Sequence, residues 1–263
     1  MSGNPVLYEV KGTAAWITLN LPEKHNALTQ ALSAGLLEGI RRANADDAAR
    51  MIVLTAEGRS FCAGADLKSS GGGAVGGTGD SSGQRPPFLD AIQALWDSPK
   101  PVIGRIQGNA YGGGLGLIAA CDFAISVEDM HLAFTEVRLG LAPSIISVFV
   151  MRKISLPAAT RYFLTGERFS AQTAVELGMM HRAVPAGELD AAVADLCGQL
   201  AHCGPQALQE VKKLLRTVPT LDVDAGLDWA AAKNLELFHG PEGREGMAAF
   251  AEKRPAAWVP KDH

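Results

Sequence analysis

The residues best suited to chemistry lie between positions 107 and 140. Three successive glycines, at 112–114, follow an apolar run at 101–106 that is typical of a buried strand, and they open a helical apolar segment. Glycine has no Cβ, so another molecule can approach this backbone closely. The first N–H groups of a helix lack intrahelical acceptors and lie at the positive end of its dipole. The turn therefore predicts a site for developing negative charge, such as an oxyanion.

Glu136 follows in a short segment between an apolar strand and a glycine turn. A carboxylate on a loop after a strand is well placed to act as a general base. Each feature also has a purely structural explanation, because the glycines could form a close-packed turn and Glu136 could be an ordinary surface charge. Their combination favours an active site.

The elements around this stretch predict an α/β fold. Residues 6–10 and 14–19 have the pattern of a hairpin, residues 29–43 that of an amphipathic helix that begins at Thr29, and residues 51–55 that of a buried strand. The order strand, strand, helix, strand is typical of α/β proteins. Beyond Glu136 the pattern is nearly all helical, with one last strand predicted at 180–184.

Two further segments are rich in small residues. Residues 59–67, RSFCAGADL, follow a strand and place backbone donors on a loop, or form a tight connection that needs small side chains. Residues 69–84 are dominated by Gly and Ser and predict a mobile surface loop. The phosphate-binding pattern GxxxxGK[ST] is missing there, so a nucleotide loop is not expected.

Composition is that of an ordinary globular protein. The chain has 263 residues, 47% hydrophobic and 20% charged, and a net charge of −4 that argues against nucleic-acid binding. Its four cysteines form no CxxC pair, which fits reduced thiols, and no metal site is predicted. Without a signal-like N-terminus or an apolar run of roughly 18 residues, we expect a cytoplasmic protein that does not enter membranes.

Several blocks resemble one known family. LPEKHNAL, FCAGADL, QGNAYGGGLGLIAACD, AFTEVRLGL and FAEKRPA occur in this order over almost the whole chain. They resemble the enoyl-CoA hydratase/isomerase (crotonase) superfamily. The resemblance implies a crotonase-like spiral of ββα repeats at 1–200 with the acyl-CoA site, and a C-terminal helical trimerisation region at 201–263. It also implies a homotrimer, or a hexamer built from two trimers.

The resemblance assigns roles to individual positions. The N–H groups of Ala65 and Gly113 would hold the thioester oxygen of an acyl-CoA substrate, and Glu136 matches one of two catalytic carboxylates. The other positions that match substrate-binding residues are Lys24, His25, Ala27, Ala63, Asp66, Leu67, Tyr111, Gly112, Phe250 and Lys253. No separate cofactor is expected, because coenzyme A is part of the substrate.

The chain departs from the typical hydratase pattern at Gly116, where the first catalytic carboxylate would stand. Hydration needs a base for water and an acid for Cα, and one carboxylate can do both in turn. Isomerases of the superfamily, which move a double bond from Δ3 to Δ2, rely mainly on a glutamate at the position of Glu136. The resemblance implies a hydratase, with an isomerase or a catalytically impaired acyl-CoA binder as alternatives.

A narrower resemblance concerns the substrate. The runs GGGLGLIAACD and VRLGLAPSIISVFV resemble bacterial 3-methylglutaconyl-CoA hydratases of leucine and isoprenoid breakdown, which also have Gly at the position of Gly116. This implies a branched acyl group with a distal carboxylate, for which Gly116 is expected to leave room. The cations that could meet this carboxylate are Arg138, Lys68 and Arg85. Tyr111 and Ser144 could act as a proton relay.

Overall fold

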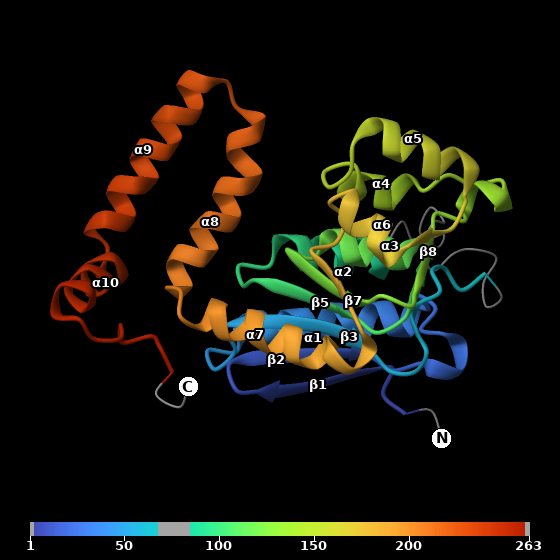
Figure 1. The fold of residues 1–263 in the computed structure, drawn as a ribbon, viewed down its shortest axis with the longest axis horizontal. Coiled ribbons are helices and arrows are strands. Elements are labelled where there is room, and N and C mark those ends of the chain that lie inside the picture. Colours follow the sequence, from blue (N-terminus) through green and yellow to red (C-terminus); the bar gives the residue numbers. More distant parts are fainter. Residues whose placement is uncertain (1–2, 68–84, 261–263) are drawn as a thin grey trace. The chain divides into compact units, whose positions relative to one another are not determined.

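The computed structural model describes residues 3–67 and 85–260 (Figure 1). The predicted mobile loop at 69–84 and Lys68 lie outside these residues. The chain divides into two compact units, one formed by residues 1–98 and 102–193 and the other by residues 99–101 and 194–263.

The first unit is built on a six-stranded sheet with the order β1-β2-β3-β5-β7-β10. Its strands are β1 (Val6–Lys11), β2 (Ala14–Leu19), β3 (Met51–Ala56), β5 (Val102–Ile106), β7 (Phe123–Val127) and β10 (Arg182–Val184). The hairpin β1–β2 is antiparallel, and its turn contains Gly12 at a φ of 57°. The remaining neighbours are parallel. Every residue of β3 is buried, as expected for the continuous apolar run of a parallel strand covered on both faces.

Four short strands form a second sheet. It has the order β4-β6-β8-β9, with β4 (Ser60–Cys62), β6 (Asn109–Tyr111), β8 (His131–Ala133) and β9 (Phe169–Ser170). Each of β4, β6 and β8 follows directly on a strand of the main sheet, and these three strands run parallel to one another. Strand, short strand and helix thus repeat along the chain, which is the predicted ββα pattern.

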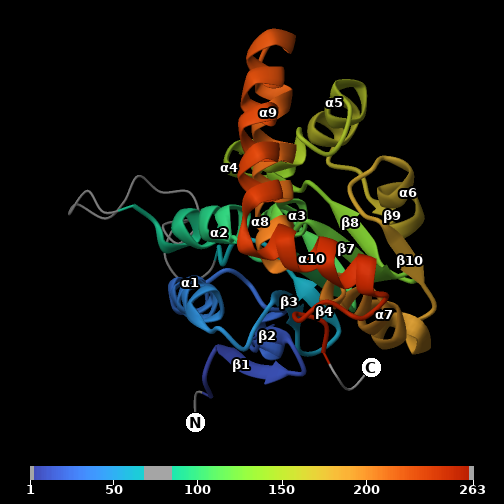
Figure 2. The ribbon, with the colours of Figure 1, turned by 90° about the vertical axis from the view of Figure 1, so that its left-hand side faces the viewer.

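Helices complete the first unit. They are α1 (Gln30–Ala45), α2 (Pro87–Asp97), α3 (Gly113–Ala120), α4 (Ser144–Val150), α5 (Leu156–Thr165) and α6 (Ala171–Glu176). Helix α1 begins at the predicted Thr29, whose side chain accepts a hydrogen bond from the Leu32 N–H at 3.1 Å. It packs beside α2 (Figure 2). Helix α3 is buried on all sides, which explains its uniformly apolar sequence. The prediction of an α/β fold is confirmed.

The second unit is helical. Helix α7 (Leu189–Ala201) leads into it, and α8 (Pro205–Thr217), α9 (Val223–His239) and α10 (Pro241–Glu252) follow, with α8 and α9 forming a hairpin (Figure 1). The carboxylate of Glu242 accepts hydrogen bonds from the N–H groups of Gln206 and Ala207, at 2.9 and 2.8 Å, and so caps α8. Among the described residues, no helix is long and apolar enough to span a membrane. The division at residue 200 and the trimer remain predictions.

Candidate active site

The candidate site lies where three strands of the second sheet end. Because β4, β6 and β8 are parallel neighbours, the segments that follow them, 63–67, 112–114 and 135–136, meet at one edge of the sheet. A cavity of about 540 Å³ opens there. Its walls are Ala63, Gly64, Ala65, Leu67, Phe88, Gly112, Gly113, Thr135, Glu136, Leu139, Leu141, Ala142, Pro143, Ser144, Ile145 and Ile146.

The segment after β4 touches the glycine turn after β6. Gly64 has a φ of 85°, and a Cβ there would lie 2.9 Å from the Tyr111 carbonyl oxygen and 3.5 Å from the Gly113 nitrogen. Only glycine combines this backbone conformation with so close an approach. The contact brings Ala65, the residue after Gly64, and Gly113, the first residue of α3, to the same cavity.

The N–H groups of Ala65 and Gly113 are available to a ligand. Neither donates to a backbone or side-chain acceptor within the described residues. The Gly113 N–H lies at the start of α3, where the helix dipole adds positive potential. Two fixed donors on one cavity can stabilise an oxygen that gains negative charge.

Glu136 lies against the glycine turn. A Cβ on Gly112, which has a φ of 48°, would be 3.1 Å from Glu136 Oε1. Glu136 begins a 3-10 turn, Glu136–Leu139, that ends at Gly140 with a φ of 73°. The Leu141 N–H donates to the Glu136 carbonyl oxygen at 3.0 Å, which fixes the backbone on the far side of the turn. The carboxylate is thus held at the cavity by a rigid loop.

The environment of Glu136 favours its neutral form. Burial raises the pKa of the carboxyl above its ordinary value, and a hydrogen bond from its own backbone N–H opposes this only in part. Oε2 is enclosed and has no hydrogen-bond partner in the part of the chain that the structure describes. No other ionisable side chain lines the cavity within those residues. A carboxylate that is desolvated and lacks a cationic partner is suited to take and return a proton.

The space beside Gly116 is filled. A Cβ on Gly116 would overlap Ile146 Cγ2 and would lie 2.9 Å from Ile146 Cβ and 3.2 Å from Ile92 Cδ1. The reason is that α4, which carries Ile146, packs directly on α3. The expectation that Gly116 leaves room for a branched acyl group is therefore wrong. Ile146, which also lines the cavity, occupies the direction in which a carboxylate at position 116 would extend.

The loop that contains the predicted substrate-binding residues Lys24, His25 and Ala27 lies against the segment after β4. The Ala63 N–H donates to the His25 carbonyl oxygen at 2.9 Å, and Lys24 Nζ lies 4.0 Å from Asp66 Oδ2. His25 has a φ of 51°, and its ring nitrogens lie 3.3 Å from Arg59 and from Ser60. Ala27 is buried next to this loop, and Leu67 lines the cavity.

Two predicted residues belong to the second unit. Phe250, in α10, is 88% exposed, and Lys253 ends that helix at a φ of 54°. Their contact with coenzyme A remains a prediction. Within residues 3–67 and 85–260, no group of three His, Cys, Asp or Glu side chains could hold a metal ion.

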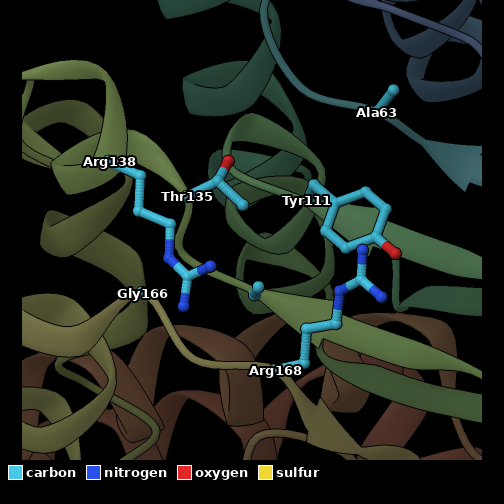
Figure 3. Close-up of a pocket in the computed structure, with 7 residues that line it drawn as sticks. Ala63, Tyr111, Thr135, Arg138, Gly166 and Arg168 are labelled. Atoms are coloured by element: carbon cyan, nitrogen blue, oxygen red, sulfur yellow. The ribbon is translucent and has the colours of Figure 1, made fainter.

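A smaller cavity of about 290 Å³ adjoins the first (Figure 3). It is lined by Ala63, Tyr111, Ala133, Thr135, Arg138, Gly166 and Arg168, so Ala63 and Thr135 belong to both cavities. Tyr111 and Arg138 line this smaller cavity and not the one that holds Glu136. Ser144 lines the larger cavity, and its hydroxyl donates to the Ala142 carbonyl oxygen at 3.3 Å. Arg85 lines neither, and it pairs with Asp90 at 3.3 Å at the start of α2.

The reasoning from sequence did not find Thr135, Ile146 or Arg168. Ile146 lies in the quoted run LAPSIIS, but nothing in that run indicates that its side chain packs on Gly116. Arg168 lies in the connection between α5 and β9, where no periodicity marks it. Only the folded chain brings these residues to the two cavities.

Comparison with known proteins identifies the family of the chain. The family model for enoyl-CoA hydratase/isomerase matches residues 9–261. Carnitinyl-CoA dehydratase of Proteus mirabilis is 33% identical over 254 residues, which cover 94% of this chain and 95% of that protein. The solved structure of an enoyl-CoA hydratase from Shewanella pealeana matches with a TM-score of 0.90 and 32% identity, over 97% of this chain and 96% of that one. An enoyl-CoA hydratase/isomerase from Marinobacter aquaeolei matches with a TM-score of 0.88 and 32% identity, over 97% and 99%. The predicted spiral of ββα repeats is confirmed.

Proposed function

The chain belongs to the enoyl-CoA hydratase/isomerase family of enzymes, and from that premise we propose that it adds water across the α,β double bond of an enoyl-CoA thioester. One observation carries the proposal. The half-buried carboxylate of Glu136 lines the same cavity as the two N–H-bearing residues Ala65 and Gly113. The cavity thus combines a base with a pair of donors for the oxygen of a thioester.

The proposed reaction uses these groups in turn. The N–H groups of Ala65 and Gly113 hold the thioester oxygen and stabilise the negative charge that it gains. Glu136 removes a proton from water as the water oxygen bonds to Cβ, and the electron pair of the double bond moves towards the thioester oxygen to give an enolate. The protonated Glu136 then returns its proton to Cα. The carboxylate ends as it began, and one water has been added.

The acyl group of the proposed substrate is short and branched, like 3-methylglutaconyl. The local resemblance around VRLGLAPSIISVFV supports this choice, as does a cavity whose walls are mostly apolar beside two arginines in the adjoining cavity. Coenzyme A is part of the substrate, and no separate cofactor takes part. We extend the proposal to a cytoplasmic homotrimer or hexamer, supported by exposed apolar side chains on the C-terminal helices, such as Leu227, Leu235 and Phe250.

A second candidate is Δ3-Δ2 enoyl-CoA isomerisation. The observation that favours it is Ile146, which fills the space where a second acid would extend from position 116. Isomerisation needs only one base, which removes a proton from C2 and returns it to C4. A binder without turnover is less well supported, because Oε2 of Glu136 is enclosed with no hydrogen-bond partner among the described residues, which destabilises the fold and gives such a protein no advantage.

The test uses three thioesters, crotonyl-CoA, 3-hexenoyl-CoA and 3-methylglutaconyl-CoA, and follows the conjugated enoyl chromophore. A hydratase removes the chromophore of the first and third, and an isomerase creates it from the second. Glu136→Gln should lower turnover by roughly 10²-fold or more without loss of thioester binding. Glu128→Gln, at an exposed carboxylate after β7, is the matched control. Normal turnover by Glu136→Gln would remove Glu136 from the mechanism.

A further inference from the structure

The smaller cavity has an unusual set of side chains. Arg138 and Arg168 enter it from different sides, with Thr135 and Tyr111 between them (Figure 3). Arg138 comes from the 3-10 turn that begins with Glu136, and Arg168 comes from the connection before β9. Two arginines from separate parts of the chain therefore line one hollow of about 290 Å³, with the guanidinium group of Arg168 on the side of Tyr111 (Figure 3).

These two charges have no counter-ion in the described residues. No carboxylate there lies within 4.0 Å of either guanidinium group. Arg138 makes a long hydrogen bond of 3.5 Å to the Thr165 carbonyl oxygen, and Arg168 lies 6.0 Å from the centre of the Tyr111 ring. Arg161, on nearby α5, is by contrast paired with Glu167. Both arginine side chains are exposed, so an anion that enters the cavity can reach their guanidinium groups and accept charged hydrogen bonds from them.

The cavity shares two wall residues with the catalytic one. Ala63 and Thr135 line both cavities, and Tyr111 directly precedes Gly112 of the oxyanion turn. An acyl chain held by its thioester oxygen near Gly113 would lie in the cavity that shares the wall residue Thr135 with the arginines. Guanidinium groups bind carboxylates by paired hydrogen bonds.

We propose that the cavity lined by Arg138, Arg168, Thr135 and Tyr111 binds the distal carboxylate of a dicarboxylic acyl-CoA whose thioester oxygen lies between Ala65 and Gly113. This inference rests on the proposed function for the placement of the thioester. A phosphate of coenzyme A has the same chemistry for a guanidinium group, so the test must separate the two sources of negative charge.

The test measures binding, so that it does not depend on turnover. Glutaryl-CoA and butyryl-CoA are saturated thioesters with and without a distal carboxylate, and their Kd values are measured by calorimetry on the full chain. The wild-type protein should bind glutaryl-CoA more tightly. Arg138→Gln and Arg168→Gln should each reduce the ratio of the two affinities by about 10-fold or more, as expected for loss of a charged hydrogen bond. Arg182→Gln, at an exposed arginine that lines neither cavity, should leave the ratio unchanged.

Each other outcome overturns the proposal. If each variant lost affinity equally for both thioesters, and lost none for the 3′-dephospho-CoA esters, the arginines would bind the 3′-phosphate of coenzyme A. A wild-type protein without preference for glutaryl-CoA would leave the cavity without this ligand, even if hydration is observed. Failure of the proposed function would give a different result. Glu136→Gln would then turn over substrate as fast as the wild-type protein, while the wild-type protein would still prefer glutaryl-CoA. Thermal unfolding of each variant confirms that it is folded.

Discussion

The packing of Gly116 on Ile146 leads to a prediction against the ordinary preference of helices. Replacing an interior helical glycine by alanine normally gains about 1 kcal/mol. In Gly116→Ala the new Cβ would overlap Ile146 Cγ2 and lie 2.9 Å from Ile146 Cβ. These atoms stand next to the backbone of a β-branched residue in a helix, which has one favoured rotamer and cannot turn aside. Overpacking should therefore cost about 3 kcal/mol, the upper end of its usual range.

The net expectation is a loss of about 2 kcal/mol in the free energy of unfolding, or roughly 30-fold in the folding equilibrium. Urea denaturation at matched protein concentrations measures it. Gly198→Ala, in α7, is the control, since a Cβ there meets nothing within 4 Å and should not destabilise. Ile146→Ala alone should cost about 2–5 kcal/mol by leaving a cavity. The double variant Gly116→Ala/Ile146→Ala should lose about 2 kcal/mol less than the sum of the losses of the two single variants. The smaller side chain at position 146 leaves space for the new Cβ at position 116.

The same pair tests the missing carboxylate. Gly116→Glu alone should destabilise the protein and lower its activity, because Ile146 blocks the new side chain. Gly116→Glu/Ile146→Ala should hydrate crotonyl-CoA faster than Ile146→Ala does, since a second acid then has space. Additive stabilities within about 0.5 kcal/mol would refute the packing argument, as would a stable Gly116→Glu protein with increased hydration.

Three further predictions concern Glu136 and the oxyanion donors. Since the base must be ionised and its pKa is raised, kcat/KM should fall with decreasing pH around a midpoint above 4.5, and a midpoint at or below 4.5 would contradict the burial argument. The raised pKa also affects stability, because the contribution of the protonated carboxyl is complete below pH 4.5 and is lost as pH rises through the folded-state pKa. Glu136→Gln should therefore have a larger free energy of unfolding than wild type at neutral pH but not in acid. Urea titrations at several pH values measure this difference. Gly113→Pro removes the N–H donor, whereas Gly113→Ala adds a similar Cβ against Leu28 and keeps the N–H. The kcat of the proline variant should be about 10²–10³-fold below that of the alanine variant. Equal kcat values would exclude this N–H as an oxyanion donor.

The main sheet and the long helices could be predicted because their residues form continuous apolar runs or recur at helical spacing. Residues 14–19 and 51–55 have the apolar runs of buried strands, and both lie in strands of the structure, Ala14–Leu19 and Met51–Ala56. The strands that position the site, β4, β6 and β8, are too short for any alternation to be visible. Their pairing depends on contacts between residues far apart in sequence.

Contacts between residues far apart in sequence also decide which parts of the site could be predicted. The glycine turn at 112–114 indicated the oxyanion site from the residues alone, whereas Ala65 was assigned to it through the family resemblance. Gly116 shows in the sequence only that a side chain is missing, and the side chain that fills its place comes from another helix. Arg138 is visible as a charge next to Glu136, but that it shares a cavity with Arg168 is decided by the second sheet and the connection before β9.

A single enclosed carboxylate has one more consequence, which concerns the path of the proton. If Glu136 alone serves the reacting carbons, the proton that it removes from a 3-enoyl-CoA at C2 is the one that it returns at C4. Because Oε2 is buried and has no hydrogen-bond partner among the described residues, exchange of that proton with solvent should be slow relative to its return. With 3-hexenoyl-CoA deuterated at C2 and ordinary water as solvent, part of the label should therefore appear at C4 of the product, as measured by mass spectrometry and NMR. Glu136→Gln should transfer none. Complete loss of label during turnover by the wild-type protein would mean that water or a second group carries the proton, and the single-carboxylate mechanism would have to be abandoned.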